Sequence, residues 1–190
     1  QPNINMSGFN FISVNKNTIL YGLGAIKGVG GNAVKHIIDE RKSNGEFKNI
    51  FDFCERVSLS SINIGTLDAL IYSGSFDVFK ENRLAMKKIL GKAMLYGQQK
   101  QNSKTTGQQE LFENKSEAFS VMHDDVSLSL KVDNTIDNRL KSLSLEKKVI
   151  GFYLSGHPIK EYQEEISSMS IKSIASYFDK LYSTDIDDDF

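Results

Sequence analysis

The segment that most constrains the fold is rich in glycine. Four glycines fall within nine residues and a fifth follows directly, at Gly22, Gly24, Gly28, Gly30 and Gly31. The interior of a helix or strand does not tolerate this density, because each glycine there costs about 0.5–1 kcal/mol relative to alanine. We therefore expect a turn in which the backbone reaches positive φ or approaches another backbone closely. Apolar residues then recur at helical spacing, so the turn opens a helix, with an apolar face at Ala33, Val34, Ile37 and Ile38.

A glycine turn at the start of a helix directs several unpaired N–H groups one way, at the positive end of the helix dipole. Such a turn binds anions, most often phosphate. A P-loop is excluded because no Lys-Ser/Thr pair follows the glycines. A dinucleotide fingerprint is excluded because Lys27 and Ala33 stand where its third glycine belongs.

The remaining pattern is hydrophobic-x-Gly-hydrophobic-Gly, at Ile26–Gly30. It looks like a helix-hairpin-helix element, which grips the sugar-phosphate backbone of DNA without reading sequence. A plain glycine turn between packed helices fits the same residues, so both interpretations stay open at this point.

Composition narrows the protein class. The 190 residues are 39% hydrophobic with two prolines, which fits one globular domain plus a less ordered part, or two small domains. The single cysteine, Cys54, excludes an internal disulfide and a cysteine-built zinc site, and its apolar neighbours predict a core thiol. The single cysteine favours a cytoplasmic location. No apolar run approaches about 18 residues, so we expect no membrane span. The chain starts Gln-Pro-Asn, which we interpret as an internal piece of a longer protein.

Charge is uneven along the chain. Residues 1–104 carry 14 Lys and Arg against 8 Asp and Glu, whereas residues 105–190 carry 9 against 16. A mildly basic first part suits a polyanionic partner, although ordinary solvated charge fits it almost as well.

The fold class expected from these patterns is mainly α. A small β-hairpin over residues 11–21 delivers the chain to the glycines. The helix that follows ends near Gly45, expected as a left-handed cap. Further helices are predicted over residues 52–57, 64–73 and 83–99, the last two capped by Asn63 and Asn82.

A second, degenerate hairpin is indicated at Leu70–Asp77, with Gly74 as its one glycine. Two such units about 45 residues apart form a weak internal repeat. The tandem matters physically, because a single helix-hairpin-helix unit is too small to bury a core.

Composition changes near residue 97, since residues 97–109 contain no strongly apolar side chain. We predict a flexible linker over residues 100–134, with one apolar island at Leu111-Phe112. Helical patterning returns at residue 135, and Pro158 favours an extended His157.

Four motifs now occur in order: Tyr21–Gly30, Asp52–Arg56, Leu70–Asp77 and Gly151–Pro158. This series resembles the C-terminal part of the catalytic subunits in the C family of bacterial replicative DNA polymerases, over nearly the whole chain. The resemblance implies the end of the fingers region at residues 1–23 and a tandem helix-hairpin-helix DNA-binding domain at 24–99. It also implies a linker with a clamp-binding motif at 100–134, and a helical segment leading toward an OB-fold at 135–190.

The resemblance implies partners and an activity for the parent protein. Gln108, Leu111 and Phe112 match the family's sliding-clamp-binding peptide, Gln-x-x-Leu/Met-Phe. A short peptide in a polar linker suits an apolar groove on a partner, although packing of the Leu-Phe pair on its own domain is the alternative. The parent is expected to be a DNA-directed DNA polymerase that uses Mg²⁺, engages primer-template duplex and contacts other replicase subunits.

The site expected within this chain binds DNA and is not catalytic. The metal-binding palm aspartates of the family lie upstream, so we expect no catalytic residue, cofactor or metal here. The predicted DNA contacts are Lys27, Gly28, Val29, Gly30, Gly31, Lys35 and Gly74. Two rivals remain: a helix-hairpin-helix domain of a repair nuclease or ligase, and a helical protein-interaction scaffold whose glycines only permit tight packing.

Overall fold

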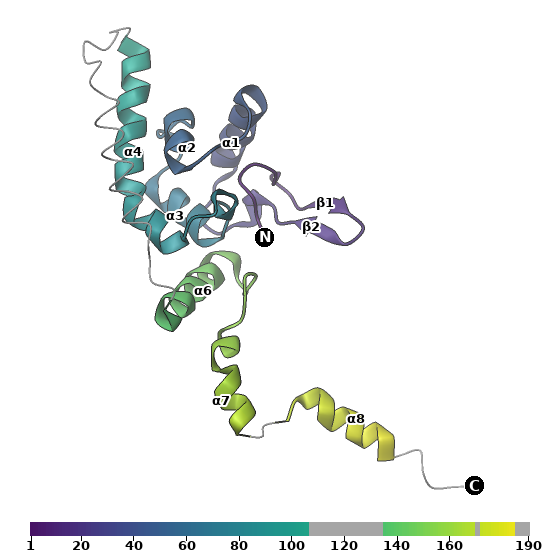
Figure 1. Cartoon of the computed structure of the whole chain (residues 1–190). Helices are drawn as coiled ribbons and strands as arrows, with labels where there is room; N and C mark the ends of the chain where they lie inside the picture. Colours follow the sequence, from purple (N-terminus) through teal and green to yellow (C-terminus); the bar gives the residue numbers. More distant parts are fainter. Residues whose placement is uncertain (107–134, 170–171, 185–190) are drawn as a thin grey trace. The chain divides into compact units, whose positions relative to one another are not determined.

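The computed structural model describes residues 1–106, 135–169 and 172–184, and these residues are mainly helical (Figure 1). The chain divides into two compact units, residues 1–155 and 156–190, which are treated separately below. The first unit contains β1 (Ile12–Asn15), β2 (Thr18–Leu20), η1 (Leu23–Ala25), α1 (Gly31–Asn44), α2 (Ile50–Arg56), α3 (Ile64–Tyr72), η2 (Asp77–Phe79), α4 (Arg83–Thr106) and α6 (Ile136–Ile150). The second contains η3 (Pro158–Tyr162), α7 (Gln163–Ser168) and α8 (Ile174–Thr184).

The predicted β-hairpin is confirmed. β1 and β2 pair antiparallel, with Ile12 opposite Leu20, and an irregularity between Ser13 and Asn15 shifts the register. The hairpin leads directly into the glycine-rich segment, as the two β-prone runs indicated.

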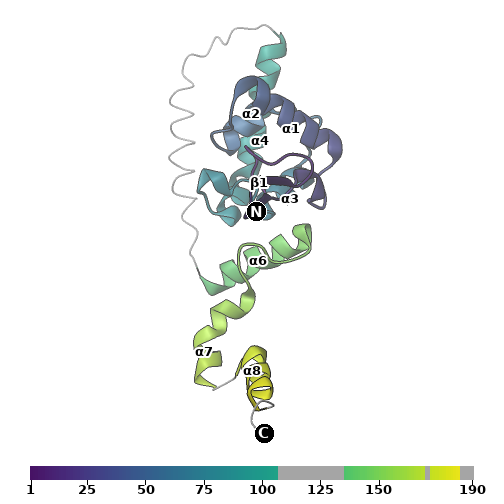
Figure 2. The same cartoon turned by 90° about the vertical axis from the view of Figure 1, so that its right-hand side faces the viewer.

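The core of the first unit is formed mainly by buried residues of α1, α2, α3 and α4, and α4 packs against both α2 and α3 (Figures 1 and 2). Aromatic rings run through it. The rings of Phe47 and Phe53 lie 4.8 Å apart between centroids, and Phe53 meets Phe76 edge-on at 5.1 Å. Residues 1–23 belong to the same core, because Ile4 and Leu23 are fully buried in it.

The predicted helix caps are confirmed in detail. The Asn63 side-chain oxygen accepts from the Thr66 N–H at 2.9 Å, and the Asn82 oxygen accepts from Leu84 and Ala85. Gly45 ends α1 with φ of 78°, but its ψ of −176° lies outside the left-handed helical region that we expected. The glycine is still needed there, because few other residues adopt this positive φ.

The helix predicted to end near Gln99 continues to Thr106. The predicted linker over residues 100–134 is therefore wrong at its start, and residues 107–134 lie outside the described residues. The reason is a polar contact that hydrophobic patterning does not register. The Gln101 side-chain amide donates to the carbonyls of Cys54 and Val57, each at 2.9 Å, at the end of α2. These carbonyls are among the unpaired acceptors that every helix leaves at its C-terminus.

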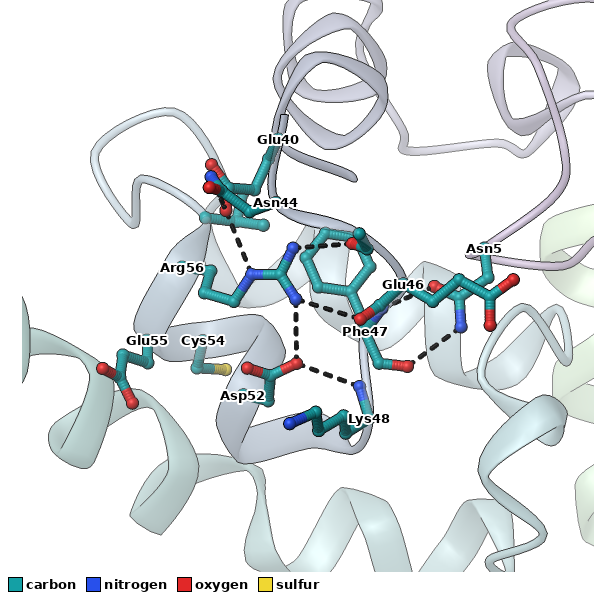
Figure 3. A network of polar contacts seen from close by, with 12 residues as sticks. Asn5, Glu40, Asn44, Glu46, Phe47, Lys48, Asp52, Cys54, Glu55 and Arg56 are labelled. Carbon is teal, nitrogen blue, oxygen red and sulfur yellow. Dashed lines mark hydrogen bonds and ion pairs between the residues drawn. The ribbon is translucent and has the colours of Figure 1, made fainter. Parts of the chain in front are cut away.

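Polar contacts fix the loop between α1 and α2 (Figure 3). The Arg56 guanidinium bonds Glu40 at 3.0 Å and Asp52 at 3.1 Å, and it lies over the Phe47 ring at 4.5 Å. Phe47 in turn exchanges two backbone hydrogen bonds of 2.9 Å with the Asn5 side chain. The N-terminal residues are thus joined to the helices by specific bonds as well as by apolar packing.

In the second unit, His157 is extended, with φ of −125° and ψ of 137°, as the following proline predicts. Its ring Nδ1 accepts from the Ile159 N–H at 3.3 Å, which caps η3. This contact gives the Gly-His-Pro corner a structural role.

Two glycines of α4 provide a matched prediction for stability. A Cβ at Gly97 would lie 2.2 Å from the Cys54 carbonyl oxygen, whereas a Cβ at Gly91 would meet nothing within 4 Å. Gly97→Ala should therefore lower the free energy of unfolding by about 2 kcal/mol, because α2 and α4 must separate. Gly91→Ala should raise it by about 0.5–1 kcal/mol, since alanine favours the helix. Urea denaturation of both variants measures the contrast, and equal effects would mean that the helices do not meet at Gly97.

Candidate nucleic-acid interface

The glycine-rich segment enters its turn pressed against residues 8–10. The N–H groups of Leu23 and Gly24 donate to the carbonyls of Gly8 and Phe9, at 2.9 and 3.0 Å. A Cβ on Gly22 would lie 2.5 Å from the Phe9 carbonyl oxygen, and a Cβ on Gly24 would lie 2.7 Å from the Phe9 ring. These two glycines therefore serve close packing, and they set the path of the chain into the turn.

The turn itself alternates buried and exposed residues. Ile26 and Val29 are buried in the core, 2% and 7% exposed, and the residues between and after them, Lys27, Gly28 and Gly30, face solvent. Gly28 has φ of 93°, which L side chains rarely adopt. The hydrophobic-x-Gly-hydrophobic-Gly pattern thus anchors the turn by its apolar residues and exposes the backbone of its glycines.

The start of α1 presents free donors. Gly30 is the N-cap and supplies no capping side chain, and the first turn of the helix holds no acidic residue. Within the described residues, no acceptor is found for the N–H groups of Gly28, Gly30, Gly31, Asn32 and Ala33. The arrangement concentrates unpaired N–H groups at the positive end of the α1 dipole, the combination that favours an anion.

Two neighbouring helices each form a hydrogen bond with the turn. The Thr66 hydroxyl on α3 donates to the Gly28 carbonyl at 3.2 Å. The Lys27 N–H donates to the Val149 carbonyl, in the last turn of α6, at 2.9 Å. These two bonds fix the backbone of the turn at Lys27 and Gly28, next to the exposed amides.

Two cations flank these amides in sequence. Lys27 and Lys35 are exposed, and neither makes an ion pair with a described residue. Their charge is therefore available to a mobile anion near the helix start, without competition from a fixed carboxylate partner.

Two of the predicted DNA contacts do not expose a free donor. Gly74 is buried and its N–H donates to the Ile71 carbonyl at 3.1 Å, so this amide has no proton left for a phosphate. Its φ of 81° serves the turn between α3 and η2. Val29 likewise uses its N–H, on the Ile26 carbonyl at 3.1 Å, and its side chain anchors the turn. The predicted clamp-binding residues, Gln108, Leu111 and Phe112, lie outside the described residues.

A polar hollow of about 690 Å³ lies beside α2, around the Arg56 network of Figure 3. Its lining carries four carboxylates against two cations, at Glu40, Glu46, Asp52, Glu55, Lys48 and Arg56. A lining of net negative charge repels a phosphate backbone. The hollow is therefore unsuited to DNA, and the turn at Gly28–Gly31 is the better candidate.

The cysteine of the chain, Cys54, is buried in the apolar core. Burial raises the pKa of the Cys54 thiol to about 12, so the nucleophilic thiolate is scarce at neutral pH. Over residues 1–106, 135–169 and 172–184, no three His, Cys, Asp or Glu side chains gather as metal ligands would. Across the same ranges, no helix has the length and hydrophobicity needed to cross a bilayer.

Comparison with known proteins agrees with this geometry. A family model described as a helix-hairpin-helix motif matches residues 1–86, which include the whole turn and α3. The DNA polymerase III subunit alpha of Buchnera aphidicola subsp. Schizaphis graminum is 36% identical over 165 residues, 87% of this chain. Those of Neisseria meningitidis serogroup A and Haemophilus influenzae are 36% and 35% identical, each over 92% of it. The chain belongs to the DNA polymerase III alpha family. It spans about 14–15% of the length of these relatives.

All four sequence motifs lie within the residues that the structure describes. The motif at Leu70–Asp77 forms the end of α3 and the start of η2, and the motif at Gly151–Pro158 follows α6. The residues that hold the turn from outside, Thr66 and Val149, were not anticipated. Nothing local marks them, because a hydroxyl or a carbonyl that bonds a turn 38 or more residues away leaves no periodic signal.

Two glycines of the turn should respond differently to alanine. Gly28→Ala should lower the free energy of unfolding by about 1–2 kcal/mol, because φ of 93° is strained for any L side chain. Gly31→Ala should leave it unchanged or raise it slightly, since a Cβ there meets only the Phe9 ring at an ordinary 3.5 Å. Thermal or urea unfolding distinguishes the two, and a neutral Gly28→Ala would contradict the turn geometry.

Proposed function

We propose that this chain holds double-stranded DNA non-specifically within a replicative DNA polymerase III alpha subunit. The observation that carries the proposal is the uncapped start of α1. Its exposed glycine N–H groups have no acceptor among the described residues, the exposed Lys27 and Lys35 flank them in sequence, and the first turn holds no acidic residue. Backbone amides and lysines of this kind contact phosphates and carry no sequence information. Such a contact suits a polymerase, which must keep hold of every sequence that it copies.

The activity proposed for the parent protein is that of a DNA-directed DNA polymerase, a nucleotidyltransferase of cytoplasmic DNA replication. The family implies Mg²⁺ for that reaction, but the described residues bring no cluster of metal ligands together. We assign no catalytic step to this chain, because the region that it resembles lies downstream of the family's metal-binding aspartates. Its contribution is to position the duplex, together with the other subunits of the replicase.

The two rival functions fare differently. A repair nuclease or ligase uses the same hairpin, but the relatives described above are all named as polymerase subunits. A helical interaction scaffold accounts for Gly22 and Gly24, whose role is close packing. It does not account for Gly30, where a Cβ would meet nothing within 4 Å.

Binding of a blunt 20-base-pair duplex should depend on salt in a way that reports the lysine. For two to four phosphate contacts, log K should fall with log salt with a slope of about −2 to −4. Lys27→Gln should weaken binding and reduce the magnitude of that slope by about 1, because one phosphate contact is lost. Fluorescence anisotropy between 25 and 200 mM salt provides the measurement.

Lys88→Gln is the matched control, because Lys88 is an exposed lysine on α4, outside the turn. It should leave the slope unchanged. A wild-type chain that binds no duplex at low salt would favour the scaffold and refute DNA binding.

We further propose that Gln108, Leu111 and Phe112 tether the parent polymerase to the sliding clamp. The peptide lies in sequence between α4 and α6, and both helices belong to the unit that carries the candidate DNA site. A clamp held through this peptide would therefore be attached to the DNA-holding unit itself. That attachment supports processive synthesis, because a clamp encircling the duplex keeps the hairpin close to its ligand.

The clamp peptide has a direct test. Leu111→Ala combined with Phe112→Ala should abolish association with a bacterial clamp, because the apolar anchors of the peptide are gone. Duplex binding should remain at the wild-type level, since the turn is untouched. Surface plasmon resonance with immobilised clamp measures the first and anisotropy the second. Equal clamp binding by the double variant would move the clamp site elsewhere.

A further inference from the structure

The molecule contains a buried carboxylate that the proposed function does not use. Glu146, on α6, is completely buried. One of its oxygens, Oε1, accepts from Arg83 Nη1 at 3.1 Å, and Oε2 accepts from the N–H groups of Leu154 and Ser155 at 2.9 and 3.1 Å. The Ser155 hydroxyl adds a fourth bond at 3.0 Å. A buried carboxylate is tolerated only when it is paired and hydrogen-bonded in this way.

Arg83 connects this carboxylate to the second glycine turn. Its guanidinium forms a two-pronged pair with Asp77, at 2.8 and 2.5 Å, and the third prong reaches Glu146. Burial alone would lower the pKa of Arg83, but the bonds and charge of Asp77, and then of Glu146, outweigh it and raise the pKa. The arginine therefore stays charged and holds both acids.

The glycine of the second turn makes room for this arginine. A Cβ on Gly74 would lie 2.3 Å from Arg83 Nη2 and 2.9 Å from the nearer Asp77 oxygen. The second hairpin thus receives a guanidinium of its own chain where the first leaves its backbone open to solvent. The Gly74 turn, through Arg83, helps to hold α6 in place.

Helix α6 also connects this buried pair to the candidate DNA site. Glu146 and Val149 lie three residues apart, and the Val149 carbonyl accepts the Lys27 N–H of the first turn at 2.9 Å. Ile150, next along the helix, is buried in the core. The position of α6 that the Arg83–Glu146 pair sets therefore decides whether this hydrogen bond forms.

We propose that Glu146 is a positioning residue for duplex binding, which seats α6 so that its Val149 carbonyl holds the Lys27 amide and orients the glycine turn. The inference rests on the proposed function, since it names what prepares that turn to bind phosphate. It also explains the hydrogen bonds of the Gly74 motif and those of the Leu154-Ser155 segment by one role, which is to hold α6 in place. The linkage joins parts of the chain on opposite sides of residues 107–134.

Glu146→Gln tests the proposal, because the amide keeps the shape of the side chain but removes its charge and turns one acceptor into a donor. We expect the dissociation constant for the 20-base-pair duplex to rise about fivefold, with the salt slope unchanged. If a smaller fraction of the molecules holds the turn in its binding-competent conformation, the measured affinity falls by that fraction, but the number of phosphates bound stays the same. A residue that touched phosphate would change the slope, so the two measurements together separate positioning from contact.

Hydrogen exchange gives a readout that does not depend on DNA. In Glu146→Gln the Lys27 amide should exchange faster, whereas the Phe53 amide, bonded to the Asn49 carbonyl in α2, should keep its rate. Asp137→Asn is the matched control, since it removes one negative charge from the exposed first turn of the same helix. It should change neither the affinity nor the exchange rate.

The outcomes separate the two proposals. Wild-type affinity and wild-type Lys27 exchange in Glu146→Gln would overturn the positioning role while leaving duplex binding intact. A wild-type chain without duplex binding would overturn the proposed function instead. If Glu146→Gln does not fold, Ser155→Ala decides the matter, because it removes a single donor to the same carboxylate. Faster Lys27 exchange in that variant supports the proposal, and an unchanged rate refutes it.

Discussion

The bonds made by one buried carboxylate, Glu146, join α6 to parts of the first unit that are distant in sequence. Glu146 lies 63 residues along the chain from Arg83, and α6 packs against both α3 and α4. Both partners are desolvated, so removal of Arg83 would leave the Glu146 carboxylate buried without its cation, whereas Arg83 would keep its pair with Asp77 if Glu146 were removed. The pair acts beside a small apolar contact, because only Leu143 and Ile150 of α6 are buried apolar residues and Val149 packs partly buried against the core.

Acidic groups and free cationic groups occupy different parts of the first unit. Acidic side chains are paired with arginine where the fold needs them, as Glu40 and Asp52 are with Arg56, or they line a hollow beside α2. The glycine turn has the opposite character, with free amides, exposed lysines and no acid in the first turn of α1. A polyanion that approaches this unit is therefore attracted to the turn and repelled from the hollow, which gives a non-specific contact a definite place.

Sequence patterns predicted those features whose cause is local. The caps at Asn63 and Asn82 and the extended His157 before Pro158 depend on neighbours within a few residues, and all were confirmed. The resemblance of four motifs identified the family, and the comparisons agree. What could not be predicted depends on contacts between distant residues. The last turns of α4 are held by Gln101 on the end of α2, and Gln101 belongs to a polar run that composition alone marks as a linker.

The same difference between local and long-range contacts explains why the two glycine turns, at Gly28 and Gly74, have different surroundings. At the level of sequence, Gly28 and Gly74 are equivalent, and each adopts positive φ at a turn between helices. What separates them is what lies against the turn. Gly28 is exposed, and a Cβ there would meet only Ala69 at an ordinary 3.6 Å, whereas the guanidinium of Arg83 lies against Gly74. Once an arginine of the same chain occupies the place where a phosphate would approach, that turn no longer serves as an anion site. If the proposed function holds, the Gly28 turn is therefore the one that meets DNA, and the number of phosphates engaged should follow from this single turn.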